Sequence, residues 1–284
     1  MQKRIPIVNT LLEALPYIKE FNGEIVVIKY GGSAQTSPEL KEKFAQDVLI
    51  LSLVGIKPVI VHGGGSRINE LLEALSIKSE FLNGHRVTDK ETMRVVEMVL
   101  SGEINKNITS LLNHHGAKAI GVSGKDSKLI EAIPKDDGKY GYTGYVKNIR
   151  EDVILNLIDE GFIPVIAPIA DSAEPNHPGF NINADIAASQ VAIALKAKKV
   201  LFLTDIVGVL DKDKKLLTTL DKYDIESYKE DGTISGGMIP KVDACIDAVE
   251  GGVDKAHIID GRVEHSILLE LFTSDGIGTQ FLIK

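Results

Sequence analysis

The segment Ile25–Ser33, IVVIKYGGS, constrains the fold of this chain more than any other. Four apolar residues precede Lys29, and Gly31 and Gly32 follow after one more residue. A buried strand of this kind holds its lysine at the carboxyl edge of a sheet. The two glycines let backbone N–H groups come close to an anion, because no Cβ stands in the way. The segment therefore predicts an anion site at a strand-to-helix turn.

A second segment, Pro58–Ser66, repeats this pattern as PVIVHGGGS. Two strand-to-glycine turns at one edge of a parallel sheet predict a site for a phosphorylated ligand. Neither turn matches GxxxxGK[ST] or GxGxxG, which disfavours a P-loop NTPase and a plain NAD-binding domain. Each turn alone is equally compatible with a tight connection that binds nothing, because glycine is common in turns.

The composition restricts the partners and the compartment. The 284-residue chain has a formal net charge of −8, which disfavours nucleic acid as a partner. To bind an acidic ligand, such a chain must concentrate lysine and arginine side chains at the binding site. The single cysteine, Cys245, cannot form an intrachain disulfide, which fits a reducing cytoplasm, and we expect it buried in a helix. We find no signal peptide and no apolar run of about 18 residues, so we expect no membrane span and a cytoplasmic location.

Alternating strand and helix patterns predict an α/β fold. We expect a three-layer sandwich with a mostly parallel central sheet, helices on both faces and an additional N-terminal kinked helix. No linker-like shift in composition divides the chain into separate domains. We therefore expect two lobes that are built on one continuous sheet. We expect strands near 24–30, 58–62, 118–122, 163–168, 200–204, 256–260 and 279–283, a hairpin within 123–150, and helices near 38–54, 66–75, 89–101, 104–115, 151–160, 186–196 and 241–250.

Residues 4–21 carry apolar side chains at helical spacing ahead of the first strand. Pro16 lies inside this pattern, so we expect a kink or a break there. The apolar stripe can pack on its own domain, or it can pair with the same helix of another subunit. The pattern alone does not choose between these two uses.

Three further segments carry candidate binding groups. In FLNGHRVTD, the turn at Asn83-Gly84 delivers Arg86, which can hold a carboxylate by bidentate contact or be a solvated surface residue. Thr88–Glu91 in the same segment reads as a capping box. The polar residues of NINAD can cap a helix or point into a cleft. The glycine-rich segment Gly232–Lys241 places a second lysine at a helix start.

The motifs IKYGGS, VHGGGS, NGHRVTD, NINAD, TDIVGVL and GGMIPK resemble the amino-acid kinase family in order and spacing. Nearly the whole chain is similar to the acetylglutamate kinases, and its N-terminal helix and C-terminal stretch resemble their arginine-sensitive branch. The resemblance implies MgATP-dependent phosphorylation of the side-chain carboxylate of N-acetyl-L-glutamate, giving N-acetyl-L-glutamyl 5-phosphate in arginine biosynthesis. Mg²⁺ would be held mainly by ATP phosphates and water.

The resemblance also implies roles for individual residues. Lys29 and Lys241 would flank the transferred phosphoryl group, Asp185 would hold both ammonium groups, and Arg86 would clamp the α-carboxylate of the substrate. Gly31, Gly32 and Gly64 would donate backbone N–H groups to the phosphates and the phosphoryl group. The remaining substrate-binding residues would be Gly64, Gly65, Asn181 and Asn183, and the remaining nucleotide-binding residues would be Asp205, Gly208, Leu210, Thr233 and Ser235.

The arginine-sensitive branch implies an oligomer and an effector site. The N-terminal helix would join dimers into a homohexamer, a trimer of dimers, with L-arginine bound near that helix as an inhibitor. The effector site would contain Lys199, His257, Glu270 and Gly276, although Glu270 could equally be a solvated helix-face residue. The implied division is residues 1–21 for oligomerisation, 22–185 for acyl-amino-acid binding and dimerisation, and 186–284 for ATP binding with the effector site.

Two classes of alternative remain open. Aspartate kinase, glutamate 5-kinase, carbamate kinase and uridylate kinase would share this fold and its ATP site. A non-catalytic nucleotide- or arginine-sensing module is the other alternative, but a sensor would not need Lys29, Lys241 and Asp185 together.

Overall fold

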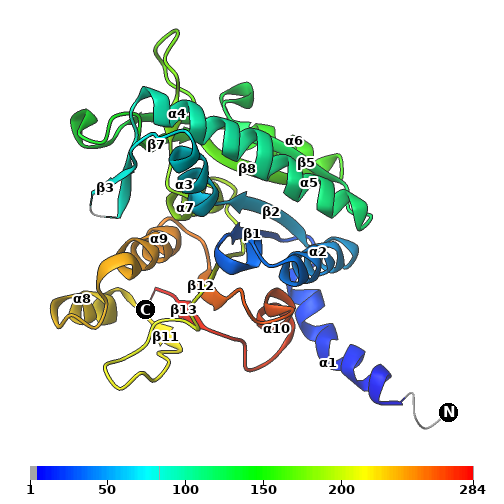
Figure 1. Cartoon of the computed structure of the whole chain (residues 1–284). Helices are drawn as coiled ribbons and strands as arrows, with labels where there is room; N and C mark the ends of the chain where they lie inside the picture. The colour runs from blue at the N-terminus through cyan, green and yellow to red at the C-terminus, as the bar shows by residue number, and fades with distance from the viewer. Residues whose placement is uncertain (1–4, 83, 284) are drawn as a thin grey trace.

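The computed structural model describes residues 5–82 and 84–283, and within these the chain builds one nine-stranded central sheet (Figure 1). The strands follow the order β11-β13-β12-β10-β1-β2-β8-β5, and β9 pairs with β8. Pairing is parallel from β12 through β5, whereas β13 runs antiparallel to β12 and β9 antiparallel to β8. The bounds are β1 (Ile25–Tyr30), β2 (Lys57–His62), β5 (Ala119–Gly124), β8 (Ile163–Ala170), β9 (Phe180–Asn181), β10 (Lys199–Thr204), β11 (Thr219–Leu220), β12 (Lys255–Asp260) and β13 (Thr279–Phe281).

Helices cover both faces of this sheet, because its central strands are apolar on both sides. In β1, Val27 packs into one hydrophobic cluster, and its neighbours Val26 and Ile28 pack into another. The predicted three-layer, mostly parallel fold is confirmed. The first cluster includes residues of α6 (Glu151–Asp159), α7 (Ala184–Ala194), α8 (Lys222–Glu230) and α9 (Ile239–Glu250), and the second includes residues of α2 (Pro38–Leu53), α5 (Asn105–His114) and α10 (Ser266–Phe272).

A third hydrophobic cluster packs α3 (Gly65–Ala74) against α4 (Lys90–Glu97) over β8. The prediction of two separate helices near 89–101 and 104–115 is wrong. A π-helical segment, η3 (Met98–Ile104), joins α4 directly to α5. The predicted capping box is wrong as well, because Asp89 is the N-cap of α4 and accepts a hydrogen bond from Thr92 N at 2.7 Å.

In the part of the chain that the structure describes, two hairpins lie outside the central sheet. The hairpin expected within 123–150 is confirmed as β6 (Ile130–Pro134) and β7 (Gly144–Ile149), with the short turns η4 (Asp126–Lys128) and η5 (Lys135–Gly138) nearby. The other pairs β3 (Glu80–Leu82) with β4 (His85–Val87). Asn83, in the turn predicted there, lies outside the described residues. This second hairpin carries Arg86 to the cleft described below.

Helix α1 (Ile5–Phe21) continues through Pro16, so a break at that residue is wrong. Its C-terminal end packs near α10, and Phe21 is buried in the second hydrophobic cluster. The rest of α1 projects from the molecule (Figure 1) and exposes Val8, Leu11 and Leu12. None of the described helices is both long and apolar enough to cross a bilayer.

Candidate active site

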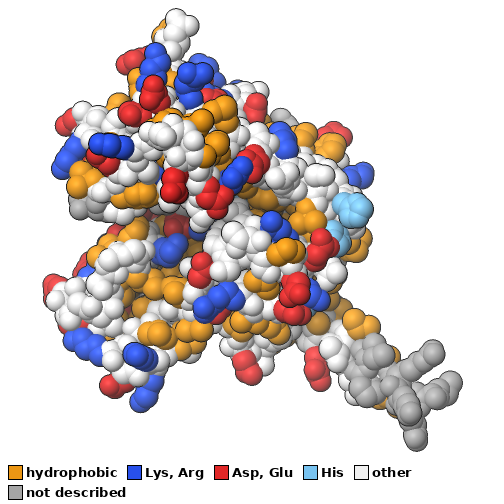
Figure 2. All heavy atoms as spheres, viewed as in Figure 1, with side chains coloured by type: hydrophobic (Ala, Val, Ile, Leu, Met, Phe, Trp, Pro, Cys, Tyr) orange, Lys and Arg blue, Asp and Glu red, His pale blue; other side chains and the backbone are white. Residues whose placement is uncertain are grey.

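A cleft of about 700 Å³ lies where β1, β2 and β8 end. The surface is hollowed between the part that contains β3 and α4 and the part that contains α8 and α9, and charged side chains of both signs lie in the hollow (Figure 2). Because the parallel strands end at one edge of the sheet, both glycine turns reach this cleft. Its lining includes nine of the predicted site residues, namely Lys29, Gly31, Gly32, Gly64, Gly65, Arg86, Asn181, Asn183 and Asp185.

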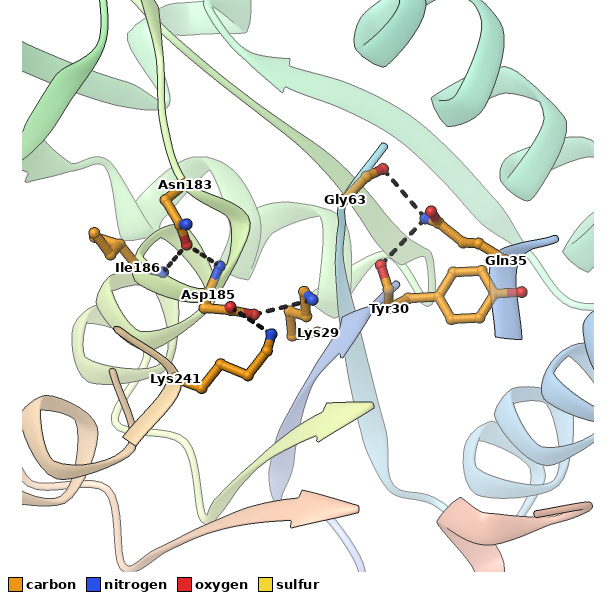
Figure 3. A network of polar contacts seen from close by, with 8 residues as sticks. All are labelled: Lys29, Tyr30, Gln35, Gly63, Asn183, Asp185, Ile186 and Lys241. Atoms are coloured by element: carbon orange, nitrogen blue, oxygen red, sulfur yellow. Dashed lines mark hydrogen bonds and ion pairs between the residues drawn. The ribbon is translucent and has the colours of Figure 1, made fainter. Parts of the chain in front are cut away.

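Lys29 and Lys241 meet at Asp185 (Figure 3). The ammonium nitrogen of Lys29 lies 3.0 Å from Asp185 Oδ1, and that of Lys241 donates to Oδ2 at 2.9 Å. Lys29 reaches the carboxylate from β1, Asp185 lies in the first turn of α7, and Lys241 lies in the first turn of α9. Segments distant in the sequence thus bring two cations to one anion.

Charge balance keeps this carboxylate ionised despite its burial. Burial alone raises the pKa of Asp185, but the attraction and hydrogen bonds of Lys29 and Lys241 outweigh burial and bring the pKa to about 2. The Lys241 side chain remains 24% exposed, compared with 9% for that of Lys29. The trio carries a net positive charge, which suits an incoming anion.

The two asparagines of NINAD occupy different positions in this arrangement. Asn183 is the N-cap of α7, and its Oδ1 accepts from Asp185 N at 2.8 Å and from Ile186 N at 3.2 Å (Figure 3). Asn181 Nδ2 donates to Thr88 Oγ1 at 3.2 Å. Both the capping and the cleft-facing interpretation therefore apply to this segment.

Gly32 begins the short 3-10 helix η2 (Gly32–Gln35) with a φ of +67°, a left-handed value that favours glycine. A Cβ at this position would lie 2.5 Å from Asp205 Oδ1, because the Asp205 side chain covers the turn. That carboxylate accepts the backbone N–H of Ser33 at 2.6 Å. Asp205, from the TDIVGVL motif, is thus drawn to the first glycine turn.

At Gly64, glycine is favoured for a different reason, because the backbone there packs closely against neighbouring side chains. A Cβ at this residue would lie 2.4 Å from Ile104 Cδ1 and 2.6 Å from Leu100 Cδ2, both in the π-helical segment η3. Gly65 begins α3, and a Cβ there would meet nothing within 4 Å. Side chains of η3 therefore pack closely against the second glycine turn at Gly64 but not at Gly65.

Arg86 is held at the cleft by three neighbours that were not predicted, Asn69, Ser79 and Phe81. It is only 7% exposed, so the solvated-surface interpretation is wrong, and its burial lowers the pKa of the guanidinium. Arg86 Nη2 donates to Asn69 Oδ1 at 2.7 Å, and Nη1 donates to Ser79 Oγ. The guanidinium also lies 4.6 Å from the centre of the Phe81 ring. The position of Asn69 one helical turn after Gly65 was the available signal in the sequence.

The other residues predicted to line the nucleotide lie in loops around β10, β11 and α9. Gly208 packs against Thr279, whose Oγ1 accepts Val209 N at 2.8 Å. Leu210 forms an isolated antiparallel bridge with Leu216. Thr233 N donates to Asp231 at 2.9 Å, and Ser235 precedes the short helix η6 (Gly236–Met238), which continues into α9.

A second cleft, of about 480 Å³, lies beside the C-terminal end of α1. All four predicted effector residues line it, together with Tyr17, Glu20 and Phe21 of α1. Lys199 Nζ and His257 Nε2 each lie 2.9 Å from Glu270 Oε1, and Ile277 N donates to Oε2 at 2.8 Å. The Glu270 side chain is 4% exposed, so its interpretation as a solvated helix-face residue is wrong.

Ion pairing also stabilises the charge on Glu270. Burial raises the pKa of this carboxyl group, but His257, Lys199 and Ile277 N together lower it to about 2. Burial lowers the pKa of both Lys199 and His257. The second cleft therefore contains a buried anion with basic partners, directly under the helix that projects from the molecule.

Comparison with known proteins places the chain in a family. The amino acid kinase family model matches residues 24–260. An acetylglutamate kinase of Aliarcobacter butzleri is 69% identical over 282 residues, covering 99% of this chain and 94% of that protein. An acetylglutamate kinase of Sulfurimonas denitrificans is 66% identical over 283 residues, covering 100% of each.

A solved structure gives a more distant match. The N-acetylglutamate synthase of Neisseria gonorrhoeae, complexed with coenzyme A and N-acetyl-glutamate, has a TM-score of 0.87 and 27% identity over 98% of this chain. The chain spans 63% of the length of that synthase. A second structure of the same synthase, with coenzyme A and L-arginine, has a TM-score of 0.81. On the family model and the full-length relatives, the chain belongs to the amino acid kinase family and, within it, to the acetylglutamate kinases.

Proposed function

We propose that this protein transfers the γ-phosphoryl group of ATP to the side-chain carboxylate of N-acetyl-L-glutamate, as a step of arginine biosynthesis in the cytoplasm. The observation that carries the proposal is the meeting of Lys29 and Lys241 at one buried carboxylate beside a cleft lined by two glycine turns. The names of the full-length relatives support this choice of acceptor.

The reaction makes a simple demand on the protein. A glutamate side chain has an ordinary pKa of about 4.3, so it is already an anion at neutral pH and needs no general base. One of its oxygens forms a bond to the γ-phosphorus while the bond from phosphorus to the β,γ-bridging oxygen breaks. That electron pair leaves with ADP, and the product is N-acetyl-L-glutamyl 5-phosphate. The principal barrier is repulsion between two anions.

Lys29, Lys241 and the glycine turns reduce that repulsion. The two ammonium groups would stabilise charge on the equatorial and leaving oxygens, and Asp185 would hold both of them in place. Backbone N–H groups of Gly31, Gly32 and Gly64 would donate to the phosphates and the moving phosphoryl group. Removing one preorganised donor of this kind typically costs on the order of 10²–10³ in kcat.

The acyl amino acid would occupy the part of the cleft nearest the β3–β4 hairpin. Arg86 would bind its α-carboxylate, supported by its fixed orientation against Asn69. Gly64, Gly65, Asn181 and Asn183 would complete this side, so residues 22–185 would form the acyl-amino-acid-binding lobe. Dimerisation through this lobe is part of the same proposal.

The nucleotide would lie against residues 186–284, along Asp205, Gly208, Leu210, Thr233 and Ser235. The contact of Asp205 with the Gly32 turn supports this placement, because it links that lobe to the phosphate-binding turn. Among the described residues, no group of three or more His, Cys, Asp or Glu side chains could hold a metal ion. Mg²⁺ would be held mainly by ATP phosphates and water, where it would neutralise phosphate charge.

L-Arginine would inhibit the enzyme from the second cleft. The buried carboxylate of Glu270 and the loop at Gly276 would bind the effector, with Lys199 and His257 as further contacts. Two observations support this assignment. A solved structure of the similar synthase contains L-arginine, and three residues of α1 line the second cleft. The exposed apolar side chains of α1 support the pairing of this helix between dimers, which would give a homohexamer.

An ADP-release assay tests the proposed acceptor. The purified protein would be supplied with MgATP and, in turn, N-acetyl-L-glutamate, L-glutamate, L-aspartate, carbamate and UMP. We expect turnover with N-acetyl-L-glutamate to exceed every other acceptor by at least about 100-fold in kcat/KM. ATP binding with no turnover on any acceptor would instead identify a sensing module.

A further inference from the structure

Gln35 joins the two glycine turns of the candidate active site (Figure 3). It is the last residue of η2, it lines the cleft, and its side chain points across to the second turn. Gln35 Nε2 donates to Tyr30 O at 3.1 Å and to Gly63 O at 3.2 Å. One amide nitrogen carries two hydrogens, so it can serve both carbonyl groups at once.

These two carbonyl groups determine where the catalytic N–H groups point. A peptide unit is planar and trans, so its C=O and the N–H of the next residue point in opposite directions. Fixing the carbonyl of Tyr30 therefore orients the N–H of Gly31. Fixing the carbonyl of Gly63 orients the N–H of Gly64 in the same way.

A second donor, the imidazole of His62, also holds the Gly63 carbonyl. The contacts of His62 show which of its two ring nitrogens carries the proton. His62 Nδ1 lies 3.0 Å from Gly63 O, and His62 Nε2 faces the amide nitrogen of Asn105 at 3.2 Å. An amide nitrogen can only donate, so Nε2 must accept, and Nδ1 carries the proton that goes to Gly63 O. Gln35 and His62 thus hold this carbonyl together.

The turn that carries Gln35 is itself anchored. Tyr30 Oη donates to Ala34 O at 2.5 Å, one residue before Gln35. The Tyr30 ring stacks on Phe44 of α2 with a centroid distance of 3.7 Å. Gly63 N also donates to Tyr30 O at 2.8 Å, so a backbone bond already brings the two turns together. The added role of Gln35 is to set the orientation of the two peptide planes.

We propose that Gln35 is a positioning residue, which aligns the N–H groups of Gly31 and Gly64 on the phosphoryl group in transit. The inference rests on the phosphoryl transfer proposed above. Gln35 contacts no reacting atom in this role. Its contribution is to geometry that matters most in the transition state, so its loss changes kcat more than KM.

The test is steady-state kinetics of Gln35→Met and Gln35→Glu with N-acetyl-L-glutamate and MgATP. Methionine keeps the length of glutamine but has no N–H, and an ionised glutamate presents only acceptors to two carbonyl groups. We expect kcat of Gln35→Met to fall about tenfold and that of Gln35→Glu to fall further, with both KM values within about twofold of the wild type. Thermal unfolding of each variant checks that it is folded.

Gln46→Met is the matched control, because Gln46 is a half-buried glutamine of α2 that does not line the cleft. Its kcat should equal that of the wild type. Folded Gln35→Met or Gln35→Glu with wild-type kcat would overturn the inference while leaving the proposed function intact. A rise in both KM values at constant kcat would also overturn it, in favour of ground-state binding. An inactive wild-type enzyme would overturn the proposed function and this inference with it.

Discussion

The ammonium groups of Lys29 and Lys241 contact opposite oxygens of one buried carboxylate, at 3.0 and 2.9 Å. Asp185 fixes the distance between the two cations and offsets part of their mutual repulsion. An anion that came to this carboxylate would therefore meet two positive charges whose positions are already fixed. This arrangement reduces the reorganisation that would otherwise accompany phosphoryl transfer.

The first prediction concerns this pair. Lys29→Met and Lys241→Met should each lower kcat by at least about tenfold, and by as much as about 10³, because each removes a positioned charge. Methionine keeps most of the side-chain length and packing. Steady-state kinetics with both substrates measure the effect, and circular dichroism checks the fold.

Lys222→Met is a suitable control, since Lys222 is an exposed residue paired with Glu250 on the surface. We expect wild-type turnover from it, because exposed ion pairs contribute little. If Lys29→Met or Lys241→Met also turned over at the wild-type rate, that lysine would have no part in the mechanism.

The second prediction compares two adjacent glycines. Gly64→Ala places a methyl group 2.4 Å from Ile104 Cδ1, whereas Gly65→Ala meets nothing within 4 Å. Gly64→Ala must therefore displace the side chains of Ile104 and Leu100 or the turn itself, at a cost of about 1–3 kcal/mol in the free energy of unfolding. It should also lower kcat at least about tenfold, since any movement of the turn misaligns a proposed N–H donor.

Gly65→Ala keeps its backbone N–H and its methyl group would meet no protein atom within 4 Å, so its free energy of unfolding should stay near that of the wild type. Chemical denaturation of both variants makes the comparison. An equal loss of stability in the two variants would show that contact with η3 does not restrict the second glycine turn at Gly64.

The strands and glycine turns of this site could be predicted because their signals are local. Lys29, Gly31 and Gly32 follow an apolar run directly, so the sequence indicates both the strand and its end. The meeting of Lys241 with Asp185 depends instead on the packing of α9 beside α7. Only the family resemblance implied this contact, because nothing in the local sequence specifies it.

Other features could not be predicted, for two physical reasons. The π-helical segment Met98–Ile104 has the apolar spacing of an ordinary helix, so its wider turn leaves no local signal. The partners of Arg86 come from α3 and from Ser79 before β3, and only the folded chain brings them together. The burial of Glu270 likewise depends on the contacts of α10 with α1 and β12 and on the ion pair with Lys199 of β10.

The third prediction concerns Arg86. Arg86→Ala should raise the KM for N-acetyl-L-glutamate at least about tenfold and leave the KM for ATP unchanged, because a charge-assisted hydrogen bond contributes about 1.5–3 kcal/mol. Arg150→Ala removes an exposed arginine that pairs with Asp152, and it should change neither constant. An increase in the KM for ATP alone would show that the two ends of the site are reversed.

The fourth prediction concerns α1. Removal of residues 1–20 should convert a hexamer into a dimer that responds less to arginine, because the proposed contact between dimers is lost. Leu12→Glu should act in the same direction, since Leu12 is 59% exposed in the structure and would be buried by helix pairing. Glu13→Gln, at an exposed polar neighbour, should leave assembly unchanged.

Light scattering after size-exclusion chromatography measures the assembly, and arginine inhibition curves measure the response. A truncated protein that remains hexameric would rule out α1 as the joining element. A dimer with unchanged arginine sensitivity would separate assembly from inhibition and place the effector site within a single dimer.

The fifth prediction concerns His62, which is fully buried behind the second glycine turn. Burial lowers its pKa from 6.5 to about 4 in the folded protein. Between these two values the unfolded chain binds a proton at His62 and the folded protein does not. The free energy of unfolding must therefore rise with pH across this window.

The expected size of this contribution follows from the same two pKa values. From pH 5 to pH 7, His62 should add about 2 kcal/mol to the free energy of unfolding of the wild type. His62→Asn cannot titrate but keeps a side-chain donor for Gly63 O, so its stability should rise less over the same range. Urea denaturation of both proteins at several pH values isolates the difference, because other titrating groups cancel. Parallel curves for the two proteins would mean that folding does not lower the pKa of His62, which would contradict its burial as a neutral imidazole.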